Sequence, residues 1–192
     1  MKIGVLALQG AFQEHIKVFK GLGIETVEVR LPKQLLGLSG LVIPGGESTS
    51  ITKLVQHYRL FEPLQELAHK GVPILGTCAG LIVMARHLTT NSIKTLGLMD
   101  ITVARNAFGR QIDSFEEEIN VPVLGKMPFK AVFIRAPIIE KVAPSVKVLA
   151  KLDNGTIVAA KQDKLLVTAF HPELSGDSRF HSYFLDMVRR KN

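Results

Sequence analysis

Short apolar runs alternate with amphipathic segments of helical spacing along the first half of the chain. The runs are rich in Val, Ile and Leu and are too short for helices, so we expect strands at residues 2–8, 25–30, 41–43 and 72–76. Apolar residues three and four apart predict helices that start near Phe12 and that cover residues 51–58, 61–68 and 81–88. For the helix at 51–58, Ser48 or Thr49 is the expected N-cap. This alternation indicates an α/β fold with a mostly parallel central sheet flanked by helices.

The second half of the chain is richer in strands. They are expected at residues 101–105, 114–120, 131–135, 146–152, 156–160 and 165–170. Asn154-Gly155 is a hairpin signal between two of them, and apolar residues at helical spacing over residues 180–188 predict a final helix packed on the sheet. Because neither an internal repeat nor a Pro/Gly/Ser-rich linker interrupts the pattern, residues 1–192 are interpreted as one domain.

Composition excludes several classes of protein. Of the 192 residues 46% are hydrophobic and 21% are charged, which is typical of a soluble globular chain. Cys78 is the only cysteine, so an intramolecular disulfide and a zinc site built from cysteine pairs are excluded, and a reduced, cytoplasmic protein is expected. The longest charge-free stretches, such as residues 72–85, are too short to span a membrane.

The formal net charge of +7 raises nucleic acid as a partner, but the pattern argues against it. Basic residues are scattered, and the one compact run, residues 189–191, suits the last turn of a helix. With no Trp and two Tyr, the chain also has few side chains on which bases could stack. We therefore expect neither a nucleic-acid nor a membrane partner, and no metal site.

Gly76-Thr77-Cys78-Ala79-Gly80 has the form G-x-C-x-G between a predicted strand and a predicted helix. It is the sulfur counterpart of the G-x-S-x-G nucleophile elbow, in which small residues permit a sharp, strained turn that projects the nucleophile. The N-terminus of the following helix favours a thiolate there. Cys78 is the candidate nucleophile, and the alternative is a buried, inert cysteine.

His171-Pro172-Glu173 follows the predicted strand at 165–170 and is the candidate partner of Cys78. Acyl transfer by a thiolate needs a general base and a group that orients this base. In an extended segment, residues two apart point to the same side, so the imidazole and the carboxylate can be presented together. The other histidines fall within or at the ends of helical patterns and are interpreted as surface or packing residues: His15, His57, His69, His87 and His181.

The turn Pro44-Gly45-Gly46-Glu47-Ser48 follows the predicted strand at 41–43. It therefore lies at the carboxyl end of a strand, where open α/β sheets bind ligands, and its glycines let the backbone approach a ligand closely. We expect the backbone N–H groups of Gly46 and Ala79 to form an oxyanion hole. The turn is no phosphate-binding loop, because G-x-x-x-x-G-K-[ST] and G-x-G-x-x-G are both absent.

Together these motifs resemble those of the class I glutamine amidotransferases, which share a Cys elbow and a His-x-Glu pair near the carboxyl end. Within that group, the chain is similar over almost its whole length to the glutaminase subunits of pyridoxal 5′-phosphate synthases. RNAFGRQ and FIRAP are the motifs that distinguish this subgroup, because the elbow and HPE are shared more widely among amidotransferases. The segments that carry the resemblance are PGGEST (44–49), GTCAGLI (76–82), RNAFGRQ (105–111), SFE (114–116), FIRAP (133–137) and HPE (171–173).

The resemblance implies a flavodoxin-like three-layer sandwich and a triad of Cys78, His171 and Glu173 that hydrolyses L-glutamine to glutamate and ammonia. It implies no cofactor in this chain. It also implies a hetero-oligomeric complex with a synthase (lyase) subunit that receives the ammonia, and weak activity until this partner docks. The residues implied to hold glutamine are Gly46, Glu47, Ser48, Arg105, Ile134 and Arg135.

Two other functions stay open. One is another hydrolase of the same fold, such as a γ-glutamyl hydrolase or a peptidase-like enzyme; RNAFGRQ and FIRAP argue against it, as does Ala79 in place of a His after Cys78. The other is a non-catalytic module that sequesters a small amide, which would have no need of an intact Cys78, His171 and Glu173. Labelling of Cys78 by 6-diazo-5-oxo-norleucine discriminates between these functions.

Overall fold

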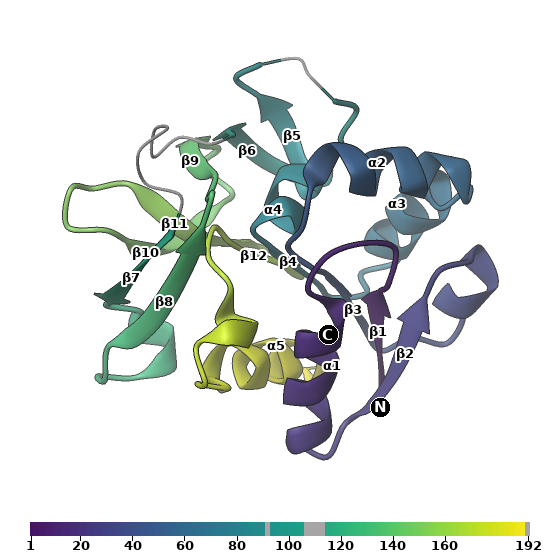
Figure 1. The fold of residues 1–192 in the computed structure, drawn as a ribbon, viewed down its shortest axis with the longest axis horizontal. Coiled ribbons are helices and arrows are strands. Elements are labelled where there is room, and N and C mark those ends of the chain that lie inside the picture. The colour runs from purple at the N-terminus through teal and green to yellow at the C-terminus, as the bar shows by residue number, and fades with distance from the viewer. Residues whose placement is uncertain (91–92, 106–113, 191–192) are drawn as a thin grey trace.

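A computed structural model of the protein describes residues 1–90, 93–105 and 114–190 (Figure 1). Ten of the described strands form one sheet, and two form a separate hairpin. One half of the large sheet is parallel, with the order β2-β1-β3-β4-β12. Its strands are β1 (Lys2–Leu6), β2 (Glu25–Val29), β3 (Gly40–Ile43), β4 (Ile74–Thr77) and β12 (Leu165–Thr168).

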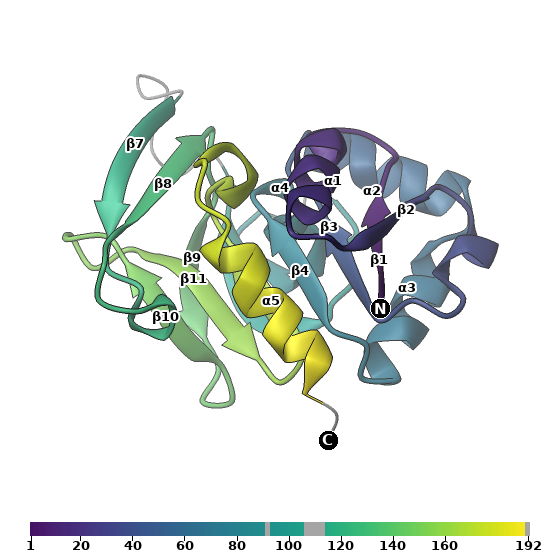
Figure 2. The same ribbon diagram turned by 90° about the horizontal axis from the view of Figure 1, so that it is seen from below.

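Helices cover both faces of the parallel half, as its sequence requires. All residues of β3, β4 and β12 are buried, so both faces of these strands need an apolar cover. Figures 1 and 2 show two helices on one face, α1 (Phe12–Gly21) and α5 (Arg179–Arg189). On the other face lie α2 (Ser48–His57), α3 (Phe61–His69) and α4 (Ala79–Met84). This is the three-layer α/β arrangement that the sequence predicts.

The other half of the sheet is mostly antiparallel and continues from β12 through β11, β9, β6 and β5, with β10 paired to β11. These strands are β5 (Ala85–Leu88), β6 (Met99–Ala104), β9 (Ile138–Val142), β10 (Lys147–Lys151) and β11 (Ile157–Gln162). The separate hairpin consists of β7 (Ser114–Ile119) and β8 (Phe129–Ile134). Three short 3₁₀ helices complete the described elements: η1 (Pro32–Leu35), η2 (Pro122–Leu124) and η3 (Pro172–Leu174).

A cluster of three buried phenylalanines joins the hairpin, the end of β12 and α5. The ring of Phe180 meets those of Phe129 and Phe170 edge to face, with centroids 4.8 and 5.2 Å apart. Each fully buried ring stabilises the fold by about 1.5–3 kcal/mol. Because Phe170 directly precedes His171, this packing fixes where the chain leaves β12.

Three details differ from the sequence prediction. The helix expected at residues 81–88 ends at Met84, and Ala85–Leu88 forms β5, an edge strand parallel to β6. No glycine or proline separates the two elements, so the apolar run gave no sign of the boundary, which strand pairing sets. Strand β9 was not expected. The N-cap of α2 is Glu47, whose carboxylate accepts the N–H groups of Thr49 and Ser50, so the prediction of Ser48 or Thr49 was wrong.

In the described part of the chain, no helix has the length and apolar character needed to cross a membrane.

Candidate active site

Cys78 occupies a strained turn between β4 and α4. Its backbone has φ 49° and ψ −104°, a combination that non-glycine residues rarely adopt and that costs of order 1–3 kcal/mol. The Cys78 N–H donates to the carbonyl of Thr168 at 2.8 Å, which ties the turn to the end of β12. The predicted elbow is therefore present, although the helix that follows it begins at Ala79 and not at the predicted residue 81.

The glycines of the elbow are required by close packing. A Cβ on Gly80 would lie 2.0 Å from the carbonyl oxygen of Ile43 in β3, and one on Gly76 would lie 2.6 Å from Sδ of Met84. Gly45 is equally confined, because its Cβ would lie 2.3 Å from Cε1 of His171 and 3.2 Å from Cβ of Cys78. The small residues thus let α4, β3 and the Gly45 turn converge on the cysteine.

His171 and Glu173 form a buried pair next to Cys78. Nδ1 of His171 lies 2.7 Å from Oε1 of Glu173, and the backbone N–H of His171 donates to the carbonyl of Val132 in β8 at 2.8 Å. The pairing agrees with the sequence prediction, but its backbone basis does not. The two residues do not lie in an extended segment: Pro172–Leu174 is a 3₁₀ turn, and Leu174 N–H donates to the His171 carbonyl. Proline at the first position of this turn favours it over a continued strand.

Charge makes the imidazole a strong base. Burial lowers the pKa of His171, but hydrogen bonds to Cys78 and Glu173, together with the negative charges of both partners, outweigh this and raise the pKa from 6.5 to about 10. Burial likewise works to raise the pKa of Glu173, yet the electrostatic interaction with His15 and the hydrogen bond from His171 outweigh it and keep the pKa of this carboxyl below its usual 4.5. The resting site therefore favours an imidazolium at His171 beside the ionised carboxylate of Glu173.

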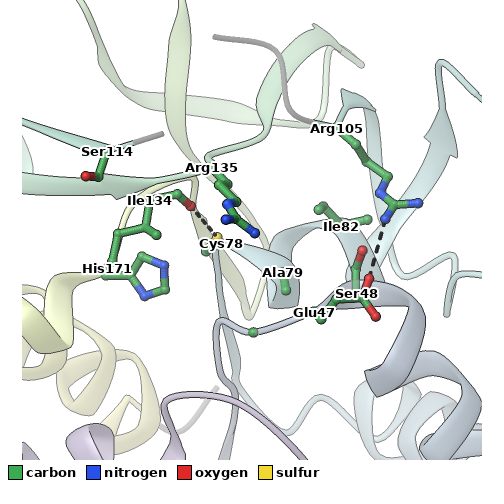
Figure 3. Close-up of a pocket in the computed structure, with 11 residues that line it drawn as sticks. Glu47, Ser48, Cys78, Ala79, Ile82, Arg105, Ser114, Ile134, Arg135 and His171 are labelled. Atoms are coloured by element: carbon green, nitrogen blue, oxygen red, sulfur yellow. Dashed lines mark hydrogen bonds and ion pairs between the residues drawn. The ribbon is translucent and has the colours of Figure 1, made fainter. Parts of the chain in front are cut away.

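A cavity of about 500 Å³ opens over Cys78 (Figure 3). In the close-up, Arg105 and Glu47 lie to one side of Cys78, and His171 lies on the other. Sγ of Cys78 is 3.7 Å from the carbonyl oxygen of Ile134. The cavity is lined by Gly46, Glu47, Ser48, Cys78, Ala79, Ile82, Arg105, Ser114, Ile134, Arg135 and His171.

Two arginines give one wall of the cavity a positive character that suits a carboxylate ligand. Nη2 of Arg105 lies 3.7 Å from Oε1 of Glu47 and 3.3 Å from Oγ1 of Thr49, so α2 helps to position it. Arg135 follows β8 with φ 44°, a strained backbone at the cavity rim. Glu47 has a second role as the N-cap, in which the hydrogen bond from Ser50, with others from Thr49, lowers the pKa of its carboxyl to about 2.

The structure brings the predicted site residues together. Gly46, Glu47, Ser48, Ala79, Arg105, Ile134 and Arg135 all line the cavity beside Cys78 and His171. Glu173 lies behind His171. Their roles in glutamine binding and in the oxyanion hole stay predictions. Residues 106–111 of the RNAFGRQ motif lie outside the described residues.

Sequence reasoning assigned no role to three residues at the site. Ile82 and Ser114 line the cavity, and both belong to quoted motifs, GTCAGLI and SFE, which were the available signal. His15 was interpreted as a surface or packing residue, but its Nε2 lies 3.3 Å from Oε2 of Glu173 and it is fully buried. Its helical setting gave no sign of this contact. Among the described residues, no group of three or more His, Cys, Asp or Glu could hold a metal ion.

Comparison with known proteins adds independent evidence. The SNO glutamine amidotransferase family matches residues 5–190. A protein of Herpetosiphon aurantiacus named pyridoxal 5′-phosphate synthase subunit PdxT is 58% identical over 190 residues, which are 97% of this chain and 100% of that protein. A protein of the same name from Dehalococcoides mccartyi is 58% identical over 98% of both chains.

Solved structures give the same picture. A crystal structure described as a glutamine amidotransferase superposes with a TM-score of 0.92 at 44% identity, covering 98% of this chain and 99% of the other. A structure described as PurLQS from Thermotoga maritima superposes with a TM-score of 0.68 at 14% identity, over 97% of this chain and 98% of the matched chain. At that identity the second structure indicates a shared fold alone.

Proposed function

The chain belongs to the SNO glutamine amidotransferase family, and we propose that it is the glutaminase subunit of a pyridoxal 5′-phosphate synthase. In this role it hydrolyses L-glutamine to glutamate and ammonia, and the ammonia serves a synthase subunit. The observation that carries the proposal is the arrangement at the cavity floor. There the strained turn at Cys78 lies next to His171, whose Nδ1 is 2.7 Å from Oε1 of Glu173. Arg105 and Arg135 line the same cavity.

The first half of the reaction forms a thioester. The Cys78 thiolate attacks the side-chain carbonyl carbon of glutamine, and the negative charge moves to the carbonyl oxygen. The His171 imidazolium then gives its proton to the departing nitrogen as the C–N bond breaks, so ammonia leaves and a glutamyl thioester remains. Glu173 stays ionised throughout and holds the imidazole with Nδ1 toward itself, leaving Nε2 for the reacting groups.

The second half returns the enzyme to its starting state. Neutral His171 takes a proton from water, and the resulting hydroxide attacks the thioester. Collapse of this second tetrahedral intermediate expels the Cys78 thiolate and releases glutamate. Both intermediates carry an oxyanion, for which the backbone N–H groups of Gly46 and Ala79 are the proposed donors; the loss of one such donor typically costs about 10²–10³ in kcat.

Substrate recognition follows from charge. The α-carboxylate of glutamine is proposed to bind the guanidinium groups of Arg105 and Arg135, because a guanidinium donates two parallel hydrogen bonds to a carboxylate. Glu47 and the carbonyl of Ile134 face the same space and provide acceptors for the α-ammonium group. Ser48, at the start of α2, completes the proposed binding set.

The partner is the second part of the proposal. The matched relatives are named as subunits of pyridoxal 5′-phosphate synthase. The two matches cover 97% and 98% of this chain. We therefore propose a hetero-oligomeric complex in which a synthase subunit receives the ammonia. Docking is proposed to order the oxyanion hole and so to raise the rate.

The direct test is release of glutamate from glutamine by the purified chain, measured alone and with the synthase subunit. We expect release that the partner stimulates. Cys78→Ala should abolish it without loss of folding. His69→Ala is the matched control and should keep wild-type rates, because His69 is exposed at the end of α3 and does not line the cavity. Absence of glutamate from folded wild-type protein under both conditions would contradict the proposal.

A further inference from the structure

A pair of buried histidines lies directly behind the proposed triad. His15 on α1 and His181 on α5 are both fully buried, although histidine is rarely completely enclosed. Nδ1 of His15 lies 2.9 Å from Nε2 of His181, and Nε2 of His15 lies 3.1 Å from Oγ1 of Thr77 and 3.3 Å from Oε2 of Glu173. Neither histidine lines the cavity, so neither is placed to touch a substrate there.

The position of His15 gives it two points of contact with the active site. Its ring lies against Oε2 of Glu173, and the other carboxylate oxygen of Glu173, Oε1, holds His171. Through Thr77 it contacts the turn at residues 44–48, because the Thr77 hydroxyl oxygen accepts the N–H of Gly45 at 3.0 Å. One imidazole therefore supports both the general base and the turn that precedes Gly46.

Hydrogen-bond accounting selects one arrangement of protons. If His15 carried its proton on Nδ1, it would donate to His181, whose own proton would then sit on Nδ1. That atom is buried with no hydrogen-bond partner among the described residues, and an orphaned buried N–H is rare. The lone pair on Nε2 of His15 would also face Oε2 of Glu173. With both protons on Nε2, His181 donates to Nδ1 of His15, and His15 donates its Nε2–H to Oγ1 of Thr77, with Oε2 of Glu173 3.3 Å from the same nitrogen.

The environment keeps both rings neutral. Burial lowers the pKa of His15 below its usual 6.5, although Glu173 pulls in the opposite direction. Burial lowers the pKa of His181 to about 3, and the neighbouring His15 adds to this shift. The titratable groups that act on His15 are Glu173 from η3, His171 just before it, and Glu14 on its own helix; His181 faces it from α5.

We propose that His15 and His181 are positioning residues for the catalytic carboxylate. Neutral His15 directs its Nε2–H at Oε2 of Glu173, which keeps that carboxylate ionised with Oε1 on His171, and His181 fixes the tautomer of His15. Within the described part of the chain, Oε2 of Glu173 is buried and has no hydrogen-bond partner of good geometry, and Nε2 of His15, 3.3 Å away, is the nitrogen placed against it. The inference rests on the proposed function for its kinetic consequence and on geometry alone for the tautomers.

The first test uses the unaltered protein. Nitrogen-15 NMR of histidine-labelled protein at neutral pH should show His15 and His181 as neutral rings protonated on Nε2. Protonation of His15 on Nδ1, or a charged His15, would overturn the proposal. This measurement needs neither a variant nor turnover.

The second test compares variants in the complex with the synthase subunit. His15→Leu removes the donor, and we expect kcat for glutamine hydrolysis to fall about 10- to 100-fold with KM little changed, as for loss of one hydrogen bond to a buried charge. The acidic limb of the pH–rate profile should move up by about one to two pH units, because an unsupported Glu173 protonates more easily. His15→Gln keeps an N–H donor and should recover most of kcat and the wild-type profile.

A matched control separates positioning from packing. Phe19→Leu trims the ring that meets His181 edge to face at 5.1 Å, so it should lower the melting temperature but leave the pH profile unmoved. A His15→Leu variant with the wild-type profile, or with no rescue by His15→Gln, would refute the positioning role. Should His15→Leu not fold, the tautomer measurement decides.

Alkylation of Cys78 by iodoacetamide gives the same comparison without glutamine. Because Cys78 is the only cysteine, the rate reports one thiol. Its acidic limb should also move up in His15→Leu and return in His15→Gln. If the alkylation profiles shift in this way but the protein releases no glutamate, the glutaminase proposal is contradicted and the positioning role stands. If glutamate is released normally but the pH profiles of His15→Leu match the wild type, the positioning role is contradicted and the glutaminase proposal stands.

Discussion

One methyl group at residue 80 should disturb both the fold and the nucleophile. In Gly80→Ala the new Cβ would lie 2.0 Å from the carbonyl oxygen of Ile43 and 2.9 Å from its carbonyl carbon. Contacts below 3.0 Å are essentially never formed by a real Cβ, so α4 and β3 must separate by about 1 Å. Both neighbours are backbone atoms, and rotation of a side chain cannot relieve the clash.

The magnitude has two parts. Overpacking of this kind costs about 1–3 kcal/mol, and for a chain of this size each kcal/mol lowers the melting temperature by about 2–4 °C. Separation of α4 from β3 also moves Cys78 and the Ala79 N–H at the start of the helix. A displacement of about 1 Å at reacting groups can cost about 100-fold in rate, so kcat should fall more than stability alone explains.

The assay pairs thermal unfolding with glutamate release, and Gly21→Ala is the matched control. Gly21 ends α1 and lacks a positive φ, and no heavy atom lies within 4 Å of the position that a new methyl group would take. Its replacement should leave kcat unchanged and raise stability slightly if at all. A Gly80→Ala protein with the melting temperature and kcat of the wild type would refute the tight approach of α4 to β3.

Three further predictions concern charge. Glu173→Gln removes one of the two partners, Cys78 and Glu173, that hold the pKa of His171 near 10, so kcat at pH 7 should fall about 10²–10⁴-fold; a loss below threefold would contradict its role. Because that pKa is raised, the stability it adds is complete below pH 6.5 and is lost as the pH rises through about 10. Urea unfolding of the wild type and of His171→Gln should therefore converge at high pH, and a constant difference would count against the shift. The pKa of Glu47 is lowered to about 2, chiefly by Ser50, so the melting temperatures of the wild type and of Glu47→Gln should differ at pH 7 and converge as the pH falls from 4.5 through 2.

Local features were predictable from the sequence because local chemistry determines them. The elbow is formed by five consecutive residues around Cys78. Close packing requires glycine at residues 76 and 80, and these glycines produce the pattern that can be recognised in the sequence. The His171–Glu173 pair lies two residues apart and needs no distant element for its 2.7 Å contact. The alternation of apolar strands and amphipathic helices likewise predicted the parallel half of the sheet.

Features that depend on distant contacts were not predictable. His15 meets His181, 166 positions later, only because α1 and α5 cover the same face of the sheet. Nothing in the helical pattern around His15 marks that contact. The boundary between α4 and β5 is also tertiary in origin, since residues 85–88 become a strand by pairing with β6. Glu47 displaced Ser48 and Thr49 as N-cap because its longer carboxylate reaches two backbone N–H groups.

The most direct test of the central claim is intact-protein mass spectrometry after incubation with the glutamine analogue 6-diazo-5-oxo-norleucine, in the presence of the synthase subunit. A glutaminase with Cys78 as nucleophile should gain one covalent adduct, mapped to Cys78, that excess glutamine prevents. Cys78→Ala should gain none, and His69→Ala should be labelled like the wild type. A folded wild-type chain that stays unmodified, or one labelled equally in Cys78→Ala, would contradict the assignment of Cys78 as the glutamine nucleophile.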